Sequence, residues 1–480
     1  MKVELLAPAG DLERLKIAFT YGADAVYLGG NLFGLRANAV NFTLEEIKEG
    51  VIYAHNLNKK VYVTVNIVLH DKELDLLDDY LKSLSEIGVD AIIISDLGII
   101  PVAKKYNLDV HISTQQSTLN KEAIKFYQKL GVTRVVLARE ASKEEIEDNI
   151  KTGMEIEIFI HGAMCASYSG RCVLSNYLTN RDANRGGCSQ ICRWDFDLIG
   201  DGKLVKGEKN FTFCSKDLML LKHINEIIDM NVTSLKIEGR MRSIYYIATV
   251  ISIYRKVIDE YCNNKDNYTY NINYEKVLTR CANRDCYVQF FDGNYGSDCN
   301  YYNERIEISN QDFLGLVLDY DEDNKMLTIE QRNYFKIGDI VEFLTPTNIG
   351  IPFTIKKMYD LDGNSLDVAR HPKQIIKIPC EINLSKNSMM RVKILGWQKQ
   401  FFIVLFCSIK KSRWNYVKYK RSFYDRKWFR RNKKRIRLFK IRKETRGNYC
   451  STRSKSLGWF IRKCWIRCCS KWTSTSWSKN

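Results

Sequence analysis

The sequence predicts an α/β fold: a (β/α)8 barrel of the TIM type, followed by a small all-β barrel domain and a basic tail. Three observations lead to this prediction. Residues 1–262 alternate short apolar strands with helical patterns eight times. Residues 311–392 change to short alternating strands separated by turn residues, and residues 393–480 lose almost every acidic side chain. The first pattern is typical of a closed parallel barrel, and the second of an antiparallel domain.

The barrel prediction rests on a repeated strand-then-helix unit. The first unit is the strand VELLAPA, followed by the amphipathic stretch DLERLKIAFTYG, which ends at a glycine. Later units include a helix from Thr43 to His55, the seventh strand EIEIFIHG, the eighth strand TSLKIEGR, and a helix from Ile244 to Tyr261. A doubly wound open sheet is the alternative. Eight units within about 260 residues favour closure into a barrel.

Four cysteines crowd the long connection that follows the seventh strand. Loop 163–195 is polar and rich in glycine, which lets a backbone fold closely around a bound object. Gathered thiolates are typical ligands of zinc or of an iron–sulfur cluster. Buried structural thiols and a disulfide pair are the alternatives, and spacing alone does not choose zinc or cluster. The expected ligands are Cys165, Cys172, Cys188 and Cys192, and Cys214 is a further thiol that could replace one of them.

Polar residues end at least six of the predicted strands, where the chemistry of such a barrel lies. Several are cations, and arginine binds carboxylates through two parallel hydrogen bonds. The barrel mouth therefore suits a small dicarboxylate or a phosphate. We expect a catalytic group of His161, Lys236, Glu238 and Arg240, and a substrate-binding group of Arg36, Asn66, Gln115 and Arg139.

Each of these residues also has a purely structural interpretation. His161 fits a hydrogen-bonded core histidine, and Glu238 with Arg240 fits an ion pair that closes the barrel. Gln115 and its neighbour Gln116 fit hydrogen bonds to the barrel backbone. The collective pattern is stronger evidence for a polar mouth than any one residue is.

Composition separates the body of the chain from its end. Residues 393–480 hold 27 Lys and Arg but only two acids, Asp425 and Glu444, and seven of the eight tryptophans follow Gly396. The formal net charge of +18 therefore hides a body, 1–392, with 47 basic and 54 acidic residues. A basic, aromatic segment can bind RNA through phosphate contacts and stacking. The serine–threonine–lysine strings favour an out-of-frame translation instead, so we expect an unstructured tail without catalytic residues.

The cellular setting follows from what the chain lacks. Residues 1–10 read as a strand and turn rather than a charged and then apolar leader, and FFIVLF is too short to cross a membrane. Many cysteines in a chain of this size without a leader favour a reducing compartment. We therefore expect a cytoplasmic protein with no membrane partner.

The cysteine loop resembles a known family. IHGAMCASYSGRC followed by LS, and then GGCSQICRW, resembles the signature of the collagenase-like peptidase family U-32, and the resemblance runs from LLAPAG to about Arg391. The chain is most similar to the branch that hydroxylates tRNA, which implies conversion of the wobble uridine to 5-hydroxyuridine with prephenate as a requirement. Related members hydroxylate a ribosomal RNA cytidine or ubiquinone precursors and carry a four-iron cluster.

This resemblance implies cofactors and partners for the site. We expect a four-iron, four-sulfur cluster on the four cysteines, with zinc as the alternative, prephenate as the small dicarboxylate ligand, tRNA as the substrate, and a paralogous partner subunit. Residues 263–310 are expected to form a linker and helical connection. The small all-β domain, similar to a translation-factor barrel, is expected to hold RNA, with an interaction module or a scaffold as alternatives.

Three functions remain open from the sequence. The first is an RNA hydroxylase with an iron–sulfur cluster. The second is a peptidase, as the family name suggests, although the chain has neither an HExxH motif nor a recognisable nucleophile elbow. A thiol pair of Cys165 and His161 is the remaining peptidase arrangement. The third is a non-catalytic RNA-binding iron–sulfur protein.

Overall fold

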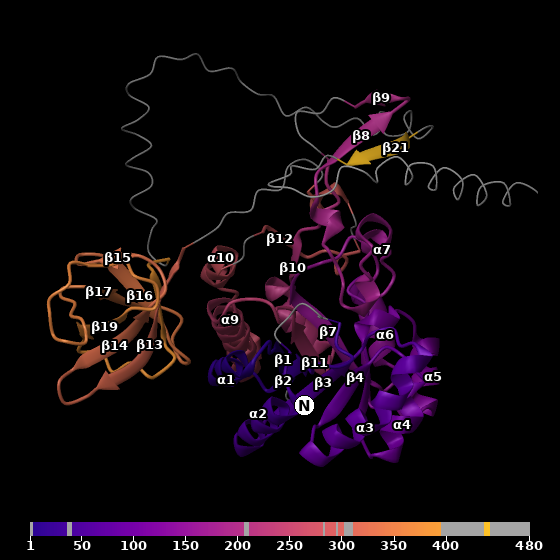
Figure 1. Cartoon of the computed structure of the whole chain (residues 1–480), viewed down its shortest axis with the longest axis horizontal. Coiled ribbons are helices and arrows are strands. Elements are labelled where there is room, and N and C mark those ends of the chain that lie inside the picture. Colours follow the sequence, from indigo (N-terminus) through magenta and orange to yellow (C-terminus); the bar gives the residue numbers. More distant parts are fainter. Residues whose placement is uncertain are drawn as a thin grey trace, which may run out of the picture.

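A computed structural model gives the arrangement of the chain. It describes residues 3–35, 41–205, 211–281, 284–293, 296–301, 311–394 and 436–441. Figure 1 shows a helix-covered barrel in indigo and magenta and a smaller strand-rich body in orange beside helices α9 and α1. In the part of the chain described, no helix has the length and apolar character to span a membrane.

Eight parallel strands form the barrel. Each strand pairs with the next along the chain, and the last, β11, pairs with both β1 and β7, which closes the ring. The predicted (β/α)8 barrel is therefore confirmed. The strands are β1 (Glu4–Pro8), β2 (Ala25–Gly29), β3 (Lys60–Val65), β4 (Ala91–Ile94), β5 (Val110–Ile112), β6 (Arg134–Val136), β7 (Glu155–Gly162) and β11 (Ser234–Ile237).

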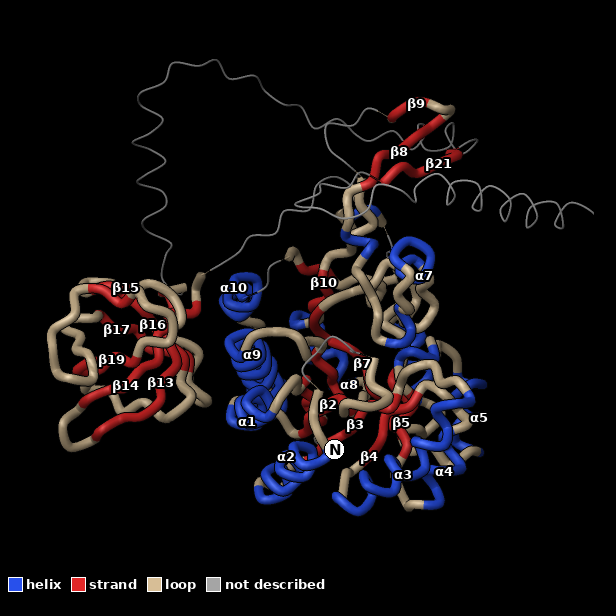
Figure 2. The backbone as a smooth tube through the Cα atoms, in the orientation of Figure 1, coloured by secondary structure: helices blue, strands red, loops and turns tan. Residues whose placement is uncertain are grey.

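Helices surround the strands, as the blue and red tube in Figure 2 shows. Local sequence fixes where several of them begin. Thr43 caps the second helix, because its hydroxyl accepts from Glu46 N while the Glu46 carboxylate accepts from Thr43 N. The helices are α1 (Leu12–Thr20), α2 (Leu44–Asn56), α3 (Asp71–Ile87), α4 (Ile99–Lys105), α5 (Lys121–Lys129), α6 (Lys143–Ile150), α8 (Ile224–Asp229) and α9 (Ile244–Asn263).

The amino ends of the barrel strands enclose a network of buried charges. Arg134 Nη1 lies 2.6 Å from Glu4 Oε1 and 3.2 Å from Glu157 Oε2. Lys236 Nζ donates to Glu157 Oε1 at 2.6 Å. Although burial would raise it, Lys236 and Arg134 hold the pKa of Glu157 below its usual value. The network is paired throughout, as buried charges must be.

Further elements extend the barrel sheet beyond the cysteine loop. Strand β10 runs antiparallel to the end of β7, and β12 pairs with β10. The loop itself contains a short helix, α7, and strands β8 and β9 follow it. The bounds are α7 (Leu174–Thr179), β8 (Phe196–Gly200), β9 (Lys203–Leu204), β10 (Asp217–Met219), α10 (Ile272–Cys281) and β12 (Cys286–Tyr287).

The C-terminal domain is all-β, as predicted. A six-stranded antiparallel sheet and a two-stranded one enclose their own apolar core. The large sheet has the order β17-β16-β20-β13-β14-β19. The strands are β13 (Phe313–Asp321), β14 (Met326–Gln331), β15 (Phe335–Lys336), β16 (Ile340–Leu344), β17 (Ile351–Thr354), β18 (Val368–Ala369), β19 (Ile375–Pro379) and β20 (Met389–Val392).

Helices α1 and α9 hold this domain against the outside of the barrel. The Tyr21 hydroxyl lies 3.1 Å from the carbonyl oxygen of Leu344 and 2.9 Å from that of Asn387. The ring of Tyr245 stacks on Phe313 at 5.2 Å between centroids. The domain therefore docks through specific contacts and not only through the chain connection.

Most of the basic tail lies outside the described residues, so its predicted lack of structure stays a prediction. The described piece, β21 (Ile436–Ile441), pairs antiparallel with β8. For these six residues the structure shows a strand instead of the expected coil. The backbone of β21 pairs with the edge of β8 that β9 leaves open, where N–H and C=O groups are available for pairing.

Candidate active site

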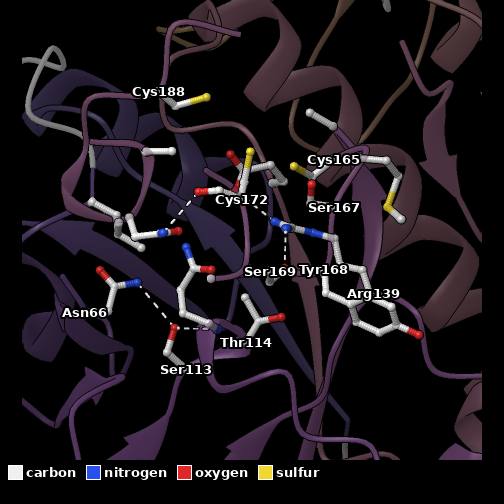
Figure 3. A pocket seen from close by; sticks show the side chains of 18 of the residues that line it. Asn66, Ser113, Thr114, Arg139, Cys165, Ser167, Tyr168, Ser169, Cys172 and Cys188 are labelled. Atoms are coloured by element: carbon white, nitrogen blue, oxygen red, sulfur yellow. Dashed lines mark hydrogen bonds and ion pairs between the residues drawn. The ribbon is translucent and has the colours of Figure 1, made fainter. Parts of the chain in front are cut away.

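A cavity of about 210 Å³ lies at the carboxyl ends of the barrel strands. The strands supply its floor, and the cysteine loop folds over it. Figure 3 shows the side chains of Cys165, Cys172 and Cys188 on one side and Asn66 and Ser113 on the other. We call this space the cysteine cavity. It lies where the active sites of (β/α)8 enzymes lie.

The four predicted ligand cysteines all line the cysteine cavity. Each is a free thiol. Glycines let the loop approach the barrel this closely: Gly170 has φ +74°, and a Cβ there would lie 2.3 Å from the Gln115 carbonyl oxygen. Residues up to 27 positions apart therefore line one cavity, and their role as ligands stays a prediction.

The thiols fit a cationic cofactor by their electrostatics. Burial, together with Cys165 and Cys188 nearby, raises the pKa of Cys192 to about 11. Burial also raises the pKa of Cys165, and the adjacent Cys172 and Cys188 add to the rise. Crowded thiols resist ionisation until a metal ion or cluster supplies positive charge, so this donor set suits such a group.

The identity of the cofactor stays a prediction. Among the described residues, no group of three histidine, cysteine or acidic side chains is already placed to hold a single metal ion. Cys214 is buried away from the described cavity lining and its thiol lies 3.6 Å from the Ser215 carbonyl oxygen. The structure thus brings together the four loop cysteines without Cys214.

Glu238 is the only carboxylate among the described residues that line the cysteine cavity. The Tyr27 hydroxyl donates to Glu238 Oε2 at 3.1 Å, and Arg139 Nη2 lies 3.7 Å from the same oxygen. Burial, and then the negative charge of Glu238, raise the pKa of Tyr27, so Tyr27 stays a hydroxyl donor. Glu238 is therefore held in one orientation by Tyr27 and Arg139.

Arg139 and Arg240 bring positive charge to the same floor. The Arg139 guanidinium lies 3.9 Å from the centre of the Phe159 ring and 3.4 Å from the Ser169 hydroxyl. Arg240 Nη1 lies 3.5 Å from the Thr64 hydroxyl. A Cβ at Gly29 would lie 2.1 Å from Arg240 Nη1, so a side chain at position 29 would displace the Arg240 guanidinium from this position. Two guanidinium groups in one cavity suit a carboxylated ligand.

Lys236 connects the cavity to the charge network beneath it. It lines the cysteine cavity, but its ammonium is the one that donates to Glu157. Burial lowers the pKa of Lys236, although Glu157 opposes this shift. The ammonium is therefore committed to a structural ion pair, which makes the structural interpretation of Lys236 stronger than the sequence suggested.

His161 does not line the cysteine cavity, so the structure does not place it with the other predicted catalytic residues, and its catalytic role stays a prediction. It is buried against α9, where Tyr254 Oη lies 3.3 Å from Nδ1, and burial lowers its pKa to about 3. The cause is a bulge: Phe159 pairs with Lys236 and His161 with Ile237, so Ile160 is an extra residue in β7. The bulge reverses the direction that alternation predicts for His161.

The predicted substrate-binding residues are placed unequally. Asn66 and Gln115 line the cavity, and Asn66 Nδ2 lies 3.3 Å from the Ser113 hydroxyl. Arg36 lies outside the described residues. Gln116, considered with Gln115, donates through Nε2 to the Ser95 carbonyl oxygen and so serves the barrel backbone.

Sequence reasoning missed several lining residues. Tyr27 and Thr64 lie within strands, and both line the cavity. An inward position in the alternation of a barrel strand was the available signal for Tyr27 and Thr64. Ser169 was missed because its position depends on how the cysteine loop folds.

Comparison with known proteins places this barrel and its cavity in one family. Peptidase family U32 matches residues 10–300, and the family's C-terminal domain matches residues 309–391. The chain therefore belongs to peptidase family U32, and the resemblance seen in the sequence is confirmed. The family boundary near residue 300 falls between the two bodies of the structure.

Relatives that are similar to this chain carry names of RNA hydroxylation. A tRNA hydroxylation protein from Bacillus subtilis (strain 168) is 50% identical over 399 residues, covering 81% of this chain and 94% of the relative. One from Escherichia coli (strain K12) is 34% identical, covering 80% of this chain and 95% of the relative. A 23S rRNA 5-hydroxycytidine synthase from Escherichia coli is 41% identical over 54% of this chain and 39% of the relative.

Proposed function

We propose that this protein is an RNA hydroxylase that acts on tRNA and converts the wobble uridine to 5-hydroxyuridine. In this proposal the four loop cysteines hold a four-iron, four-sulfur cluster, and prephenate is the dicarboxylate co-substrate. The carrying observation is the cysteine cavity, whose described lining residues include four thiols, three arginines and one carboxylate. The names of the two long relatives support tRNA as the substrate.

The residues of the chain have separable roles in this reaction. Arg139 and Arg240 bind the carboxylates of the co-substrate, because guanidinium groups form paired hydrogen bonds with carboxylates. Hydroxylation at C5 is a two-electron oxidation, so it needs an oxygen-atom donor that is itself reduced by two electrons. As that oxygen bonds to C5, the C5 hydrogen leaves as a proton that a base accepts. Glu238, oriented by Tyr27 and Arg139, is the base that the cavity offers.

The cofactor has one proposed position. Cys165, Cys172, Cys188 and Cys192 would hold it, and a bound cluster would supply redox or Lewis-acid chemistry at the cavity. The chain contributes a glycine-rich loop that encloses the site and hydroxyl and amide groups that orient a substrate.

Mass spectrometry of tRNA from a strain that lacks this protein, with no paralogue present, tests the reaction. We expect 5-hydroxyuridine to disappear and to return with the wild-type chain but not with Glu238→Gln. Glu226→Gln is the matched control, because Glu226 lies on α8 outside the cavity. Unchanged 5-hydroxyuridine in the deletion strain would contradict the proposal. Tight binding of tRNA without turnover under any donor would favour the non-catalytic RNA-binding function.

A peptidase is the second function that the family name raises. The thiol pair proposed for it needs His161 to face Cys165, but His161 lies behind β7 against Tyr254 and Tyr246 of α9. The described site therefore lacks a base for Cys165 from this histidine. We expect no hydrolysis of gelatin by the purified chain, and hydrolysis that survives loss of the cofactor would restore the peptidase function.

A further inference from the structure

A second space, which we call the side hollow, opens beside the cysteine cavity. Its volume is about 480 Å³, within the range of roughly 300–1,000 Å³ that is usual for ligand sites. The two spaces share part of one wall, including Asn66, Gln115 and Asn184. The reaction proposed above assigns no ligand to the side hollow. An occupant there would lie next to the thiols and arginines of the cysteine cavity.

The shared wall is built from strand ends that are tied to each other. Asn66 follows β3, and the Ser95 hydroxyl after β4 lies 2.9 Å from the Asn66 carbonyl oxygen. Ser113 follows β5, and its hydroxyl accepts from Asn66 Nδ2 and Gln115 N, each at 3.3 Å. The close packing of Gly170 fixes the Gln115 backbone from the other side. The side chains of Asn66 and Gln115 therefore lie on a fixed frame.

Two amide oxygens in this wall have no protein partner among the described residues. Asn66 Oδ1 and Gln115 Oε1 are shielded from solvent and accept no hydrogen bond from any described residue. A shielded acceptor loses its bond to water on folding, which costs free energy until a ligand or a bound water supplies a donor. The neighbouring Gln116 donates through its amide to the Ser95 carbonyl oxygen and so stabilises the barrel backbone, whereas the Gln115 amide makes no such contact with a described residue.

The two side chains differ in what they leave for a ligand. Asn66 donates one N–H of Nδ2 to Ser113, so its oxygen and its second N–H remain, and the oxygen is the acceptor it offers. Gln115 makes no side-chain hydrogen bond to any described residue, so its whole amide presents an acceptor beside a donor. The matching ligand group for Gln115 is an N–H next to a carbonyl, and the matching group for Asn66 is a single donor.

A uridine inside an RNA chain has this set of groups. Its donors are the base N3–H, which lies between two ring carbonyls, and the ribose 2′-hydroxyl. Apolar side chains of the hollow, Leu35 and Leu97, offer surface for the faces of a base. Enzymes that modify a base draw it out of its stack into such a pocket and read its edge there.

We propose that the side hollow binds the target uridine of the RNA. Gln115 recognises the base through N3–H and an adjoining carbonyl, and Asn66 accepts the 2′-hydroxyl. This assignment rests on the proposed function, because it places the substrate of that reaction. It makes Gln115 the residue that selects uracil and Asn66 the residue that selects ribose.

Binding of chemically altered RNA tests this site without turnover. Four anticodon stem–loop RNAs, identical except for uridine, 3-methyluridine, 2′-deoxyuridine or cytidine at the wobble position, are titrated with the chain by fluorescence anisotropy. For the wild type we expect 3-methyluridine to weaken binding about 5- to 150-fold, the usual discrimination of a bidentate amide contact; cytidine is the comparison base, because a rotated amide can also pair with its N3 and N4–H edge. We expect 2′-deoxyuridine to weaken it about 3- to 10-fold, the loss of one hydrogen bond.

Variants then assign each loss to one side chain. Gln115→Leu should bind the uridine and 3-methyluridine RNAs equally but keep the preference for ribose, and Asn66→Leu should show the reverse. Gln128→Leu is the matched control, since Gln128 lies on α5 and donates to the Thr152 carbonyl; it should behave as the wild type.

The outcomes separate the site from the function. Wild-type binding that is equally tight for all four RNAs overturns the side hollow as the uridine site and leaves the hydroxylase proposal standing. Absence of binding to every RNA removes the hydroxylase proposal itself and the site with it. Because the wild-type comparison needs no substitution, a variant that fails to fold does not affect this decision.

Discussion

The two ends of the barrel treat their polar groups in opposite ways. At the amino ends of the strands, Glu4, Arg134, Glu157 and Lys236 pair with one another, with distances of 2.6 to 3.2 Å. At the carboxyl ends, four free thiols line one cavity, and two amide oxygens lack a partner among the described residues. The first arrangement stabilises the fold. The second arrangement leaves polar groups available to bind ligands, and so indicates the binding site at the carboxyl ends of the strands.

The largest effect expected from this contrast is on stability at the amino end. Glu157→Ala removes the partner of two buried cations, so the free energy of unfolding should fall by about 3–5 kcal/mol. Urea denaturation measures it. Glu155→Ala is the control, because Glu155 also binds Arg134 but is 51% exposed, and it should cost about 1 kcal/mol or less. Equal losses in both variants would contradict the distinction between buried network and surface pair.

The next effect is on ligand binding at the carboxyl end. Arg139→Gln removes a guanidinium from the cysteine cavity, so affinity for prephenate should fall about 10- to 100-fold, the usual cost of a lost charged hydrogen bond. The midpoint of thermal unfolding should change little. Isothermal titration calorimetry measures the affinity, and Arg181→Gln in the exposed part of the loop is the control. An unchanged affinity would show that the arginines of the floor do not bind the carboxylates.

His161 provides a smaller, pH-dependent test. Its pKa is lowered from 6.5 to about 3 by burial, so the unfolded chain binds the proton more readily than the folded chain does. The stability contribution is therefore complete above pH 6.5 and is lost as the pH falls toward 3, by about 2 kcal/mol between pH 7 and pH 5.

Comparison with His161→Asn isolates this contribution. Urea denaturation of the variant should show a weaker loss between pH 7 and pH 5, while hydroxylation of tRNA should stay within about threefold of the wild type. Loss of activity with unchanged stability would instead return His161 to the catalytic group.

The smallest effect concerns the tail. A chain that ends at Ile394 should keep its hydroxylation activity, and its free energy of unfolding should stay within about 0.5 kcal/mol of the full chain, as for changes away from the core. Complementation of the deletion strain and urea denaturation measure both. A loss of RNA binding in the shortened chain would assign the basic residues a role.

Much of the fold could be predicted because its signals are local. Apolar period, caps such as Thr43 and glycine stops mark each unit of the barrel, and the cysteine spacing marks the loop that covers it. The partners of a side chain are not local. Lys236 finds Glu157 from 79 positions away, and only the three-dimensional structure shows that this ammonium is occupied.

His161 and Gln115 show two further limits of prediction. The single extra residue at Ile160 reverses His161, and nothing in the apolar pattern of EIEIFIHG marks that bulge. Gln115 and Gln116 have the same side chain, so the sequence does not show which of them contacts the barrel backbone. Their different roles depend on which amide reaches the Ser95 carbonyl, and this follows from the turn after β5.

Iron and sulfide content after anaerobic purification tests the central claim most directly, together with the visible absorption band of a cluster. We expect the wild-type chain and Cys262→Ser, altered at an exposed thiol outside the cavity, to contain stoichiometric iron and sulfide. Single serine replacements at Cys165, Cys172, Cys188 or Cys192 should lose both, whereas Cys214→Ser should retain them. Zinc in place of iron, or iron that persists in the loop variants, would contradict the account.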